Sequence, residues 1–147
     1  MQTKFWKMLD FLKTQFIERD EVLRLMIAAL IGRFHVYLLG SAGVGKSQMV
    51  EMLTHCIDGA KVFGCQLSET HTVEDVIGPM AFSKFKQDIH ERVIDDYLAD
   101  AHVALLDEIG RSNGPLRNAL YKIINEREYK NGKTTVSCPL QTLFVGS

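Results

Sequence analysis

The chain has 147 residues, of which 46% are hydrophobic and 24% are charged, the composition of one globular domain with ample apolar material for a core. This composition excludes a disordered chain, and the length leaves too little room for two full domains. Seventeen basic side chains against eighteen acidic ones give a net charge of −1, so charge alone predicts no nucleic-acid or anionic-membrane partner.

The longest apolar run, residues 25–32, stops at Arg33 and is far shorter than the ~18 residues that a membrane-spanning helix requires. The N-terminal residues lack the apolar region and cleavage site of a signal peptide. We therefore expect no membrane span and a cytoplasmic protein. Cys56, Cys65 and Cys138 are odd in number and widely spaced, which predicts reduced thiols in the core rather than a disulfide framework or a zinc site.

Apolar residues at helical spacing predict two amphipathic helices, over residues 5–16 and 22–30, separated by a charged break. The apolar run at 35–39 predicts a strand, and the glycine-rich stretch after it leads into a helix that Gly59 ends. Residues 61–67 predict a second strand. Strand, loop, helix and strand in this order indicate a βαβ arrangement with a parallel sheet.

The pattern loosens after residue 73, where Gly78-Pro79 breaks the chain. Residues 80–93 alternate between apolar and polar side chains as a hairpin does, and a short acidic helix is expected after them. We therefore predict an insertion at about residues 78–93.

The next predicted element is a strand, indicated by a continuous apolar run at 103–106. Such a run is typical of a central parallel strand buried on both faces. Ser112 is expected to cap the next helix, with Pro115 in its first turn. Lys130-Asn131-Gly132-Lys133 has the residues of a hairpin turn, and residues 140–145 predict a fourth buried strand.

One motif with a physical mechanism lies between the first strand and the helix after it. Residues 40–47 satisfy G-x-x-x-x-G-K-[ST], the pattern of a loop whose inward-pointing amides and helix N-terminus hold phosphate. Lys46 would reach the β and γ phosphates, and Ser47 would ligate magnesium. The alternative is a glycine-rich turn that happens to end in Lys-Ser. The expected nucleotide contacts are Gly40, Ser41, Ala42, Gly43, Val44, Gly45, Lys46, Ser47 and Gln48.

Two adjacent carboxylates follow the buried strand at 103–106, at the end of a parallel strand where ligands bind. Asp107 would hold the magnesium shell, and Glu108 would polarise an attacking water. The alternative is an acidic pair at a strand exit on the surface. The same residues also begin Asp107-Glu108-Ile109-Gly110, which fits the D-x-x-G of GTPases, although the chain contains no N-K-x-D guanine motif.

The chain as a whole resembles the MoxR family of AAA+ ATPases, most closely its RavA-like branch. The resemblance covers nearly all 147 residues. Its motifs are the phosphate loop at 40–47, Glu18-Arg19-Asp20-Glu21-Val22, Val76-Ile77-Gly78-Pro79, Leu105-Leu106-Asp107-Glu108-Ile109, and Ile124-Asn125-Glu126-Arg127-Glu128-Tyr129 followed by Asn131-Gly132.

The resemblance implies an α/β P-loop NTPase core of the AAA+ type, with three layers and a parallel sheet, over residues 1–147. It implies ATP and Mg²⁺ as cofactors, and ATP hydrolysis coupled to the remodelling or maturation of a protein complex. It also implies a hexameric homo-oligomeric ring, a partner with a von Willebrand A domain and a protein client. The insertion at about 78–93 would be the hairpin in helix 2 that faces the ring pore or the substrate.

The resemblance assigns phosphate and magnesium binding to Lys46 and Ser47, and the magnesium and water roles to Asp107 and Glu108. It makes Ile17 a candidate adenine contact, although a staple between two helices explains this residue equally well. Sensor 1, the fifth strand, the arginine finger and the helical lid would all follow Ser147. We therefore expect a core truncated before the fifth strand, with an unpaired edge beside the first strand and poor activity alone.

Two other functions stay open at this point. One is a module that binds ATP without hydrolysing it and so orders an assembly interface, and the other is a GTPase. Arg111, Arg117 and Arg127 follow the acidic pair. A solvated helix face is the favoured interpretation of these arginines, and contact with a neighbour in a ring is the alternative.

Overall fold

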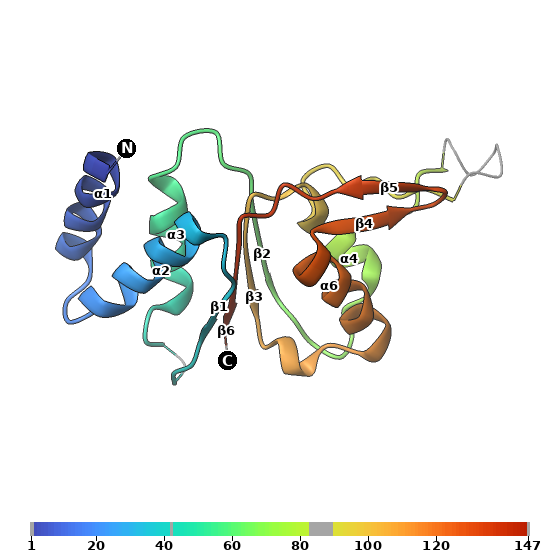
Figure 1. Ribbon diagram of the computed structural model, residues 1–147. Helices are drawn as coiled ribbons and strands as arrows, with labels where there is room; N and C mark the ends of the chain where they lie inside the picture. The colour runs from blue at the N-terminus through green and yellow to red at the C-terminus, as the bar shows by residue number, and fades with distance from the viewer. Residues whose placement is uncertain (1, 42, 83–89, 147) are drawn as a thin grey trace.

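The computed structural model describes residues 2–41, 43–82 and 90–146, and its centre is a four-stranded parallel sheet (Figure 1). The strands lie in the order β1-β6-β3-β2. Their bounds are β1 (Val36–Leu38), β2 (Val62–Gln66), β3 (Val103–Asp107) and β6 (Thr142–Gly146). Because all neighbours pair in parallel, the four carboxyl ends lie along one edge of the sheet.

Helices cover both faces of this sheet, which confirms the expected three-layer α/β core (Figure 1). One face carries α1 (Gln2–Gln15), α2 (Asp20–Gly32) and α3 (Lys46–His55). The other carries α4 (Val73–Ile77), α6 (Gly114–Glu126), the short helix η1 (Leu98–Asp100) and a hairpin of β4 (Glu128–Asn131) and β5 (Thr134–Ser137). None of the described helices is long and apolar enough to cross a membrane.

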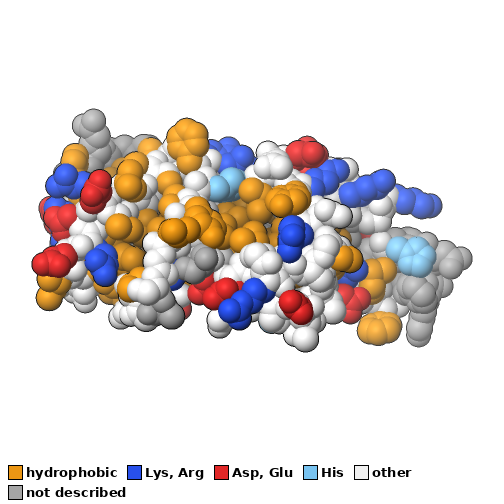
Figure 2. All heavy atoms as spheres, turned by 90° about the horizontal axis from the view of Figure 1, so that it is seen from below, with side chains coloured by type: hydrophobic (Ala, Val, Ile, Leu, Met, Phe, Trp, Pro, Cys, Tyr) orange, Lys and Arg blue, Asp and Glu red, His pale blue; other side chains and the backbone are white. Residues whose placement is uncertain are grey.

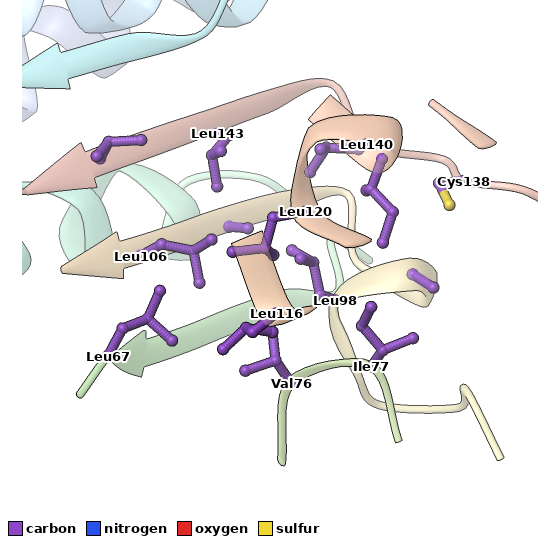
Figure 3. Packing of buried hydrophobic residues seen from close by; sticks show 14 residues of the cluster. Leu67, Val76, Ile77, Leu98, Leu106, Leu116, Leu120, Cys138, Leu140 and Leu143 are labelled. Atoms are coloured by element: carbon purple, nitrogen blue, oxygen red, sulfur yellow. The ribbon is translucent and has the colours of Figure 1, made fainter. Parts of the chain in front are cut away.

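The central strand β3 explains why the sheet is buried on both faces. Val103 and Leu105 pack in the core beneath α1 to α3, whereas Ala104 and Leu106 pack in the core against α6. This alternation follows from the two-residue repeat of a strand. Figure 3 shows the second core, where Leu106 and Leu143 of the sheet lie with Leu120 of α6. The continuous apolar run in the sequence therefore serves two separate cores.

Among the element boundaries that differ from the sequence prediction, two have a visible structural cause. The helix α3 ends at His55 rather than at Gly59. The Cys56 amide bonds to the carbonyl three residues earlier, that of Leu53, at 3.2 Å, and this tighter turn ends the helix. The last strand begins at Thr142 rather than at residue 140. The carbonyl of buried Leu140 instead accepts a hydrogen bond from Arg127 Nε at 3.0 Å.

The insertion predicted at 78–93 is described at its base, and its tip at 83–89 lies outside the described residues. Met80 and Arg92 form an antiparallel bridge, as a hairpin requires. Gly78 has φ +116, and a Cβ there would lie 1.8 Å from the Val93 carbonyl oxygen. Only glycine fits this position. The acidic helix expected next is the single turn of η1.

The hairpin turn predicted at Lys130–Lys133 is confirmed between β4 and β5, and it also contacts the base of the insertion. Asn131 is buried, its Oδ1 accepts from the Arg92 amide at 2.6 Å, and its Nδ2 donates to the Arg92 carbonyl at 3.0 Å. This pair of bonds attaches the insertion to the β4–β5 hairpin.

The prediction of core thiols is right for Cys138, and Cys65 packs against the same core. Cys138 is buried, and burial raises the pKa of its thiol to about 11. Cys65 is half-buried and Cys56 is exposed, so the prediction is wrong for Cys56. Cys56 follows the last turn of α3, where its thiol donates to the Met52 carbonyl at 3.3 Å instead of entering the core.

We expect His35 to make folding pH-dependent. Its Nδ1 accepts the Leu143 amide at 3.0 Å and its Nε2 donates to the Ile124 carbonyl at 2.8 Å, so only the neutral ring makes both bonds. Burial lowers the pKa of His35 below 6.5, so the unfolded state binds more protons and stability is lost as pH falls below about 6.5. Chemical denaturation from about pH 7.5 to 5.5 should show this decline, and His35→Gln should show a shallower one. Parallel curves for the two proteins would contradict this origin.

Candidate functional site

The loop between β1 and α3 has the curled backbone that its motif predicts. Gly43 and Gly45 have φ of +82 and +79, a conformation that L side chains rarely adopt. Gly45 also caps α3, since its carbonyl accepts the Met49 amide at 2.9 Å. The curl and the start of a ten-residue helix bring backbone N–H groups and partial positive charge together. Ala42, also a predicted contact, lies outside the described residues.

The loop and the acidic pair border a single cavity of about 380 Å³. Its lining residues are Gly43, Val44, Gly45, Lys46, Ser47, Gln48, Gln66, Asp107 and Glu108. Most of the residues predicted for phosphate and magnesium thus lie together, although they come from separate parts of the chain. Gly40 and Ser41 line an adjacent groove instead.

Gln66 is a member of this cavity that sequence reasoning missed. It is the last residue of β2 and lies opposite Asp107 in the parallel register. A single glutamine at the end of a strand belongs to no motif, so only the pairing of β2 with β3 could have located it. Its amide adds a neutral donor and a neutral acceptor beside Asp107, on the strand side of the cavity.

The ammonium group of Lys46 lies against the beginning of its own loop. Its Nζ donates to the Gly40 carbonyl at 2.6 Å and is 3.3 Å from the Ser41 carbonyl. An ammonium group is attracted more strongly to an oxygen that carries negative charge than to a neutral carbonyl oxygen. A phosphate in the cavity would therefore offer Lys46 better acceptors than these two carbonyls.

The exit of β3 is shaped by an uncommon backbone conformation at Glu108, with φ 56 and ψ 39. This conformation directs the Glu108 amide to the Gly146 carbonyl at 3.0 Å and to Asp107 Oδ1 at 3.1 Å. The carboxylate of Asp107 also occupies the space beside Gly146, where a Cβ would lie 2.2 Å from Oδ1. The position of Asp107 is thus fixed by its two neighbours at the edge of the sheet.

The adjacent groove has a volume of about 520 Å³ and shares Val44 and Lys46 with the cavity. Its other lining residues are Arg19, Val22, Leu25, Val36, Tyr37, Leu38, Leu39, Gly40, Ser41 and Met49. Ile17, the predicted adenine contact, is 89% exposed and does not line this groove. Arg19, two residues later, does. Sequence reasoning missed it because an arginine before a helix carries no specific signal.

The turn after β3 corrects the predicted helix cap. Ser112 is buried and donates to the Ile109 carbonyl at 2.7 Å, so its hydroxyl closes the turn η2 (Ile109–Arg111). The cap of α6 is Asn113, whose Oδ1 accepts the Leu116 amide at 3.0 Å. The Nδ2 of Asn113 donates to the His71 carbonyl at 2.7 Å, which joins this turn to the loop after β2.

Two of the three arginines after the acidic pair are partly exposed and also bind backbone carbonyls of this chain. Arg117 Nη2 donates to the Ser112 carbonyl at 2.6 Å and the Gly110 carbonyl at 3.2 Å. Arg127 Nη2 donates to the Arg33 carbonyl at 2.6 Å. Arg111 is exposed, and its Nε lies 3.2 Å from Oε2 of Glu108.

The three-layer fold and the cavity beside the loop define a protein of the AAA+ class. More particularly, residues 3–147 match the family described as the MoxR domain in MoxR-vWA-beta-propeller ternary systems. The chain belongs to this MoxR family of AAA+ proteins, which supports an ATPase-type function.

Individual relatives agree with this assignment. An uncharacterized protein of Methanocaldococcus jannaschii is 33% identical over 145 residues, which are 98% of this chain and 38% of that protein. Chaperone MoxR1 of Mycobacterium tuberculosis is 24% identical over 138 residues, 92% of this chain and 35% of that protein. A crystal structure of a candidate ATPase from Cytophaga hutchinsonii has the same fold, with a TM-score of 0.74 and 22% identity over 99% of this chain and 43% of that one. The chain spans less than half of each of these proteins.

Because Asn113 caps α6, Asn113→Ala should lower the free energy of unfolding by about 1 kcal/mol or more. The control is Asn118→Ala, at an exposed position on the same helix. Urea denaturation should show a clearly larger loss for Asn113→Ala. Equal losses in the two variants would mean that the cap contributes nothing of its own.

Proposed function

We propose that this chain binds ATP with Mg²⁺ in the cavity between the loop and the acidic pair and hydrolyses it to ADP and phosphate. One observation carries the proposal: Lys46, Ser47, Asp107 and Glu108 line the same cavity, as triphosphate binding and hydrolysis require. The cavity lies at the carboxyl edge of a parallel sheet, the usual place for ligands in such folds.

The triphosphate would lie over the loop amides, where the start of α3 favours negative charge. Lys46 would leave the carbonyls of Gly40 and Ser41 and bind the β and γ phosphates. The hydroxyl of Ser47 and the carboxylate of Asp107 are oxygen donors of the kind that Mg²⁺ prefers, so the residues present fit this ion. When bound, Mg²⁺ neutralises charge that develops on the phosphate oxygens.

Glu108 would act as the general base for the attacking water. Glu108 and Asp107 are the two acidic residues that line this cavity, and we assign them separate roles. Asp107 is held at the strand end by the Glu108 amide, whereas the side chain of Glu108 extends from the turn. Positioned general bases contribute about 10²–10⁴-fold to rate.

The adenine would occupy the adjacent groove, whose apolar side chains suit a base. This groove shares Val44 and Lys46 with the phosphate cavity. Val22 and Met49 would contact the ring, and Arg19 would lie at its edge. Ile17 is 89% exposed and does not line this groove, so it is not among the proposed adenine contacts.

For the whole protein we propose a homo-oligomeric ring, a hexamer, that uses ATP hydrolysis to remodel or mature a protein complex. The family's description from systems that include a vWA component supports a von Willebrand A domain partner. The insertion at about 78–93 would contact the protein client.

Two variants separate this function from its alternatives. Lys46→Ala should weaken ATP binding at least ~10-fold in calorimetry because the ammonium is lost, while Lys122→Ala, at an exposed lysine on α6, should bind normally. Glu108→Gln should keep ATP binding and lose about 10²-fold or more in phosphate release. Turnover that is unchanged in Glu108→Gln would favour a module that does not hydrolyse ATP. Preferential binding of GTP in competition would favour a GTPase.

Gly146 provides an independent test of the role of Asp107. A Cβ at residue 146 would collide with Asp107 Oδ1, so Gly146→Ala should displace this carboxylate and weaken Mg²⁺-dependent ATP binding by roughly 10-fold. Gly64→Ala is a matched control, because Gly64 lies in β2 of the same sheet and a Cβ there meets no atom within 4 Å. If both variants bind ATP with Mg²⁺ equally well, Asp107 is not the magnesium ligand.

A further inference from the structure

An ion pair connects the proposed general base with an exposed arginine. The Nε of Arg111 lies 3.2 Å from Oε2 of Glu108, and the two side chains are 68% and 32% exposed. Exposed ion pairs generally contribute little to folding stability. Stability therefore gives no sufficient reason for this pair, and the position of Glu108 in the cavity suggests a role in the site.

The turn that carries Arg111 is held from several sides. The Arg111 amide bonds to the Glu108 carbonyl at 2.9 Å, and Ser112 donates to the Ile109 carbonyl at 2.7 Å. Arg117 of α6 donates to the carbonyls of Gly110 and Ser112. Arg111 thus projects from a fixed backbone, which gives its guanidinium a defined place relative to the strand end.

We propose that Arg111 is a positioning residue for Glu108. By holding Oε2, the guanidinium restricts the rotation of the Glu108 carboxylate and leaves Oε1 for the attacking water. A free glutamate side chain loses rotamer freedom when it is fixed, and fixing it before the reaction removes that cost from the chemical step. This inference rests on the proposed function.

The oxygen of water forms a bond to the γ phosphorus while one O–H bond of that water breaks and its proton passes to Oε1 of Glu108. The bond between the γ phosphorus and the bridging oxygen breaks, and ADP leaves with the electron pair. Glu108 then returns the proton to solvent or phosphate. Arg111 keeps its proton throughout.

Solvent reaches both side chains of the pair, since Arg111 is 68% and Glu108 32% exposed. Figure 2 looks from below Figure 1, onto the edge where the strands end, and shows acidic and basic side chains next to each other beside a band of hydrophobic ones. Arg111 is also exposed enough to be replaced without opening the core.

The test compares Arg111→Ala and Arg111→Lys in the complete protein, with Arg24→Ala, an exposed arginine on α2, as the matched control. Arg111→Ala should lower kcat by roughly 10-fold with KM and the affinity for ATP unchanged, because it alters a group that acts only in the chemical step. Arg111→Lys should recover part of the loss. A lower kcat at an unchanged KM separates positioning of Glu108 from a general loss of structure, which would also weaken ATP binding.

Several results would overturn the inference. An unchanged or higher kcat in Arg111→Ala would do so, and so would a rise in KM that accounts for the whole loss of kcat/KM. The double variant with Glu108→Gln should be no slower than Glu108→Gln alone, and additive losses would mean that Arg111 acts elsewhere. If Glu108→Gln itself retains turnover, the proposed function fails together with the inference. If Glu108→Gln loses turnover and Arg111→Ala does not, the inference fails alone.

Discussion

The parallel register of β2, β3 and β6 is the constraint on which the rest of this molecule depends. It aligns Gln66, Asp107 and Gly146 at one edge of the sheet, and the Glu108 amide closes that edge by bonding to the Gly146 carbonyl. Because β6 lies between β1 and β3, the loop after β1 and the acids after β3 are two strand spacings apart, about 10 Å. That separation leaves room for a chain of phosphates between the loop amides and the carboxylates.

The helix α6 makes this edge rigid because it is fixed at both ends. At its beginning Asn113 bonds to the loop after β2, and Arg117 holds the turn after β3. Beyond its end, Arg127 donates to the carbonyls of Arg33 and Leu140, so it joins the approach to β1 with the approach to β6. A site that must hold reacting groups in place benefits from such support by regular elements.

The sequence allowed good prediction wherever a repeat or a motif encodes structure. Helical spacing located α1 and α2, the apolar run located β3, and the phosphate loop pattern located the curl before α3. It failed where tertiary contacts decide between similar residues. Ser112 and Asn113 are both good caps, but Ser112 is buried and bonds backward, which leaves the cap to Asn113. Cys56 is exposed because α3 ends at His55. The spacing of apolar residues does not show at which residue a helix ends.

The glycine of the Gly78-Pro79 break and the glycine of the Asn131-Gly132 turn are needed for the same structural reason. Gly78 lies against the Val93 carbonyl, and a Cβ at Gly132 would lie 2.8 Å from the His90 carbonyl oxygen, so both glycines allow close approach to the returning strand of the insertion. Asn131 then bonds to both backbone groups of Arg92. Because the β4–β5 hairpin directly follows α6, contacts run without interruption from the turn at the proposed ATP site, along α6, to the base of the insertion. Chains of packed side chains and hydrogen bonds of this kind can carry energetic coupling between two distant sites.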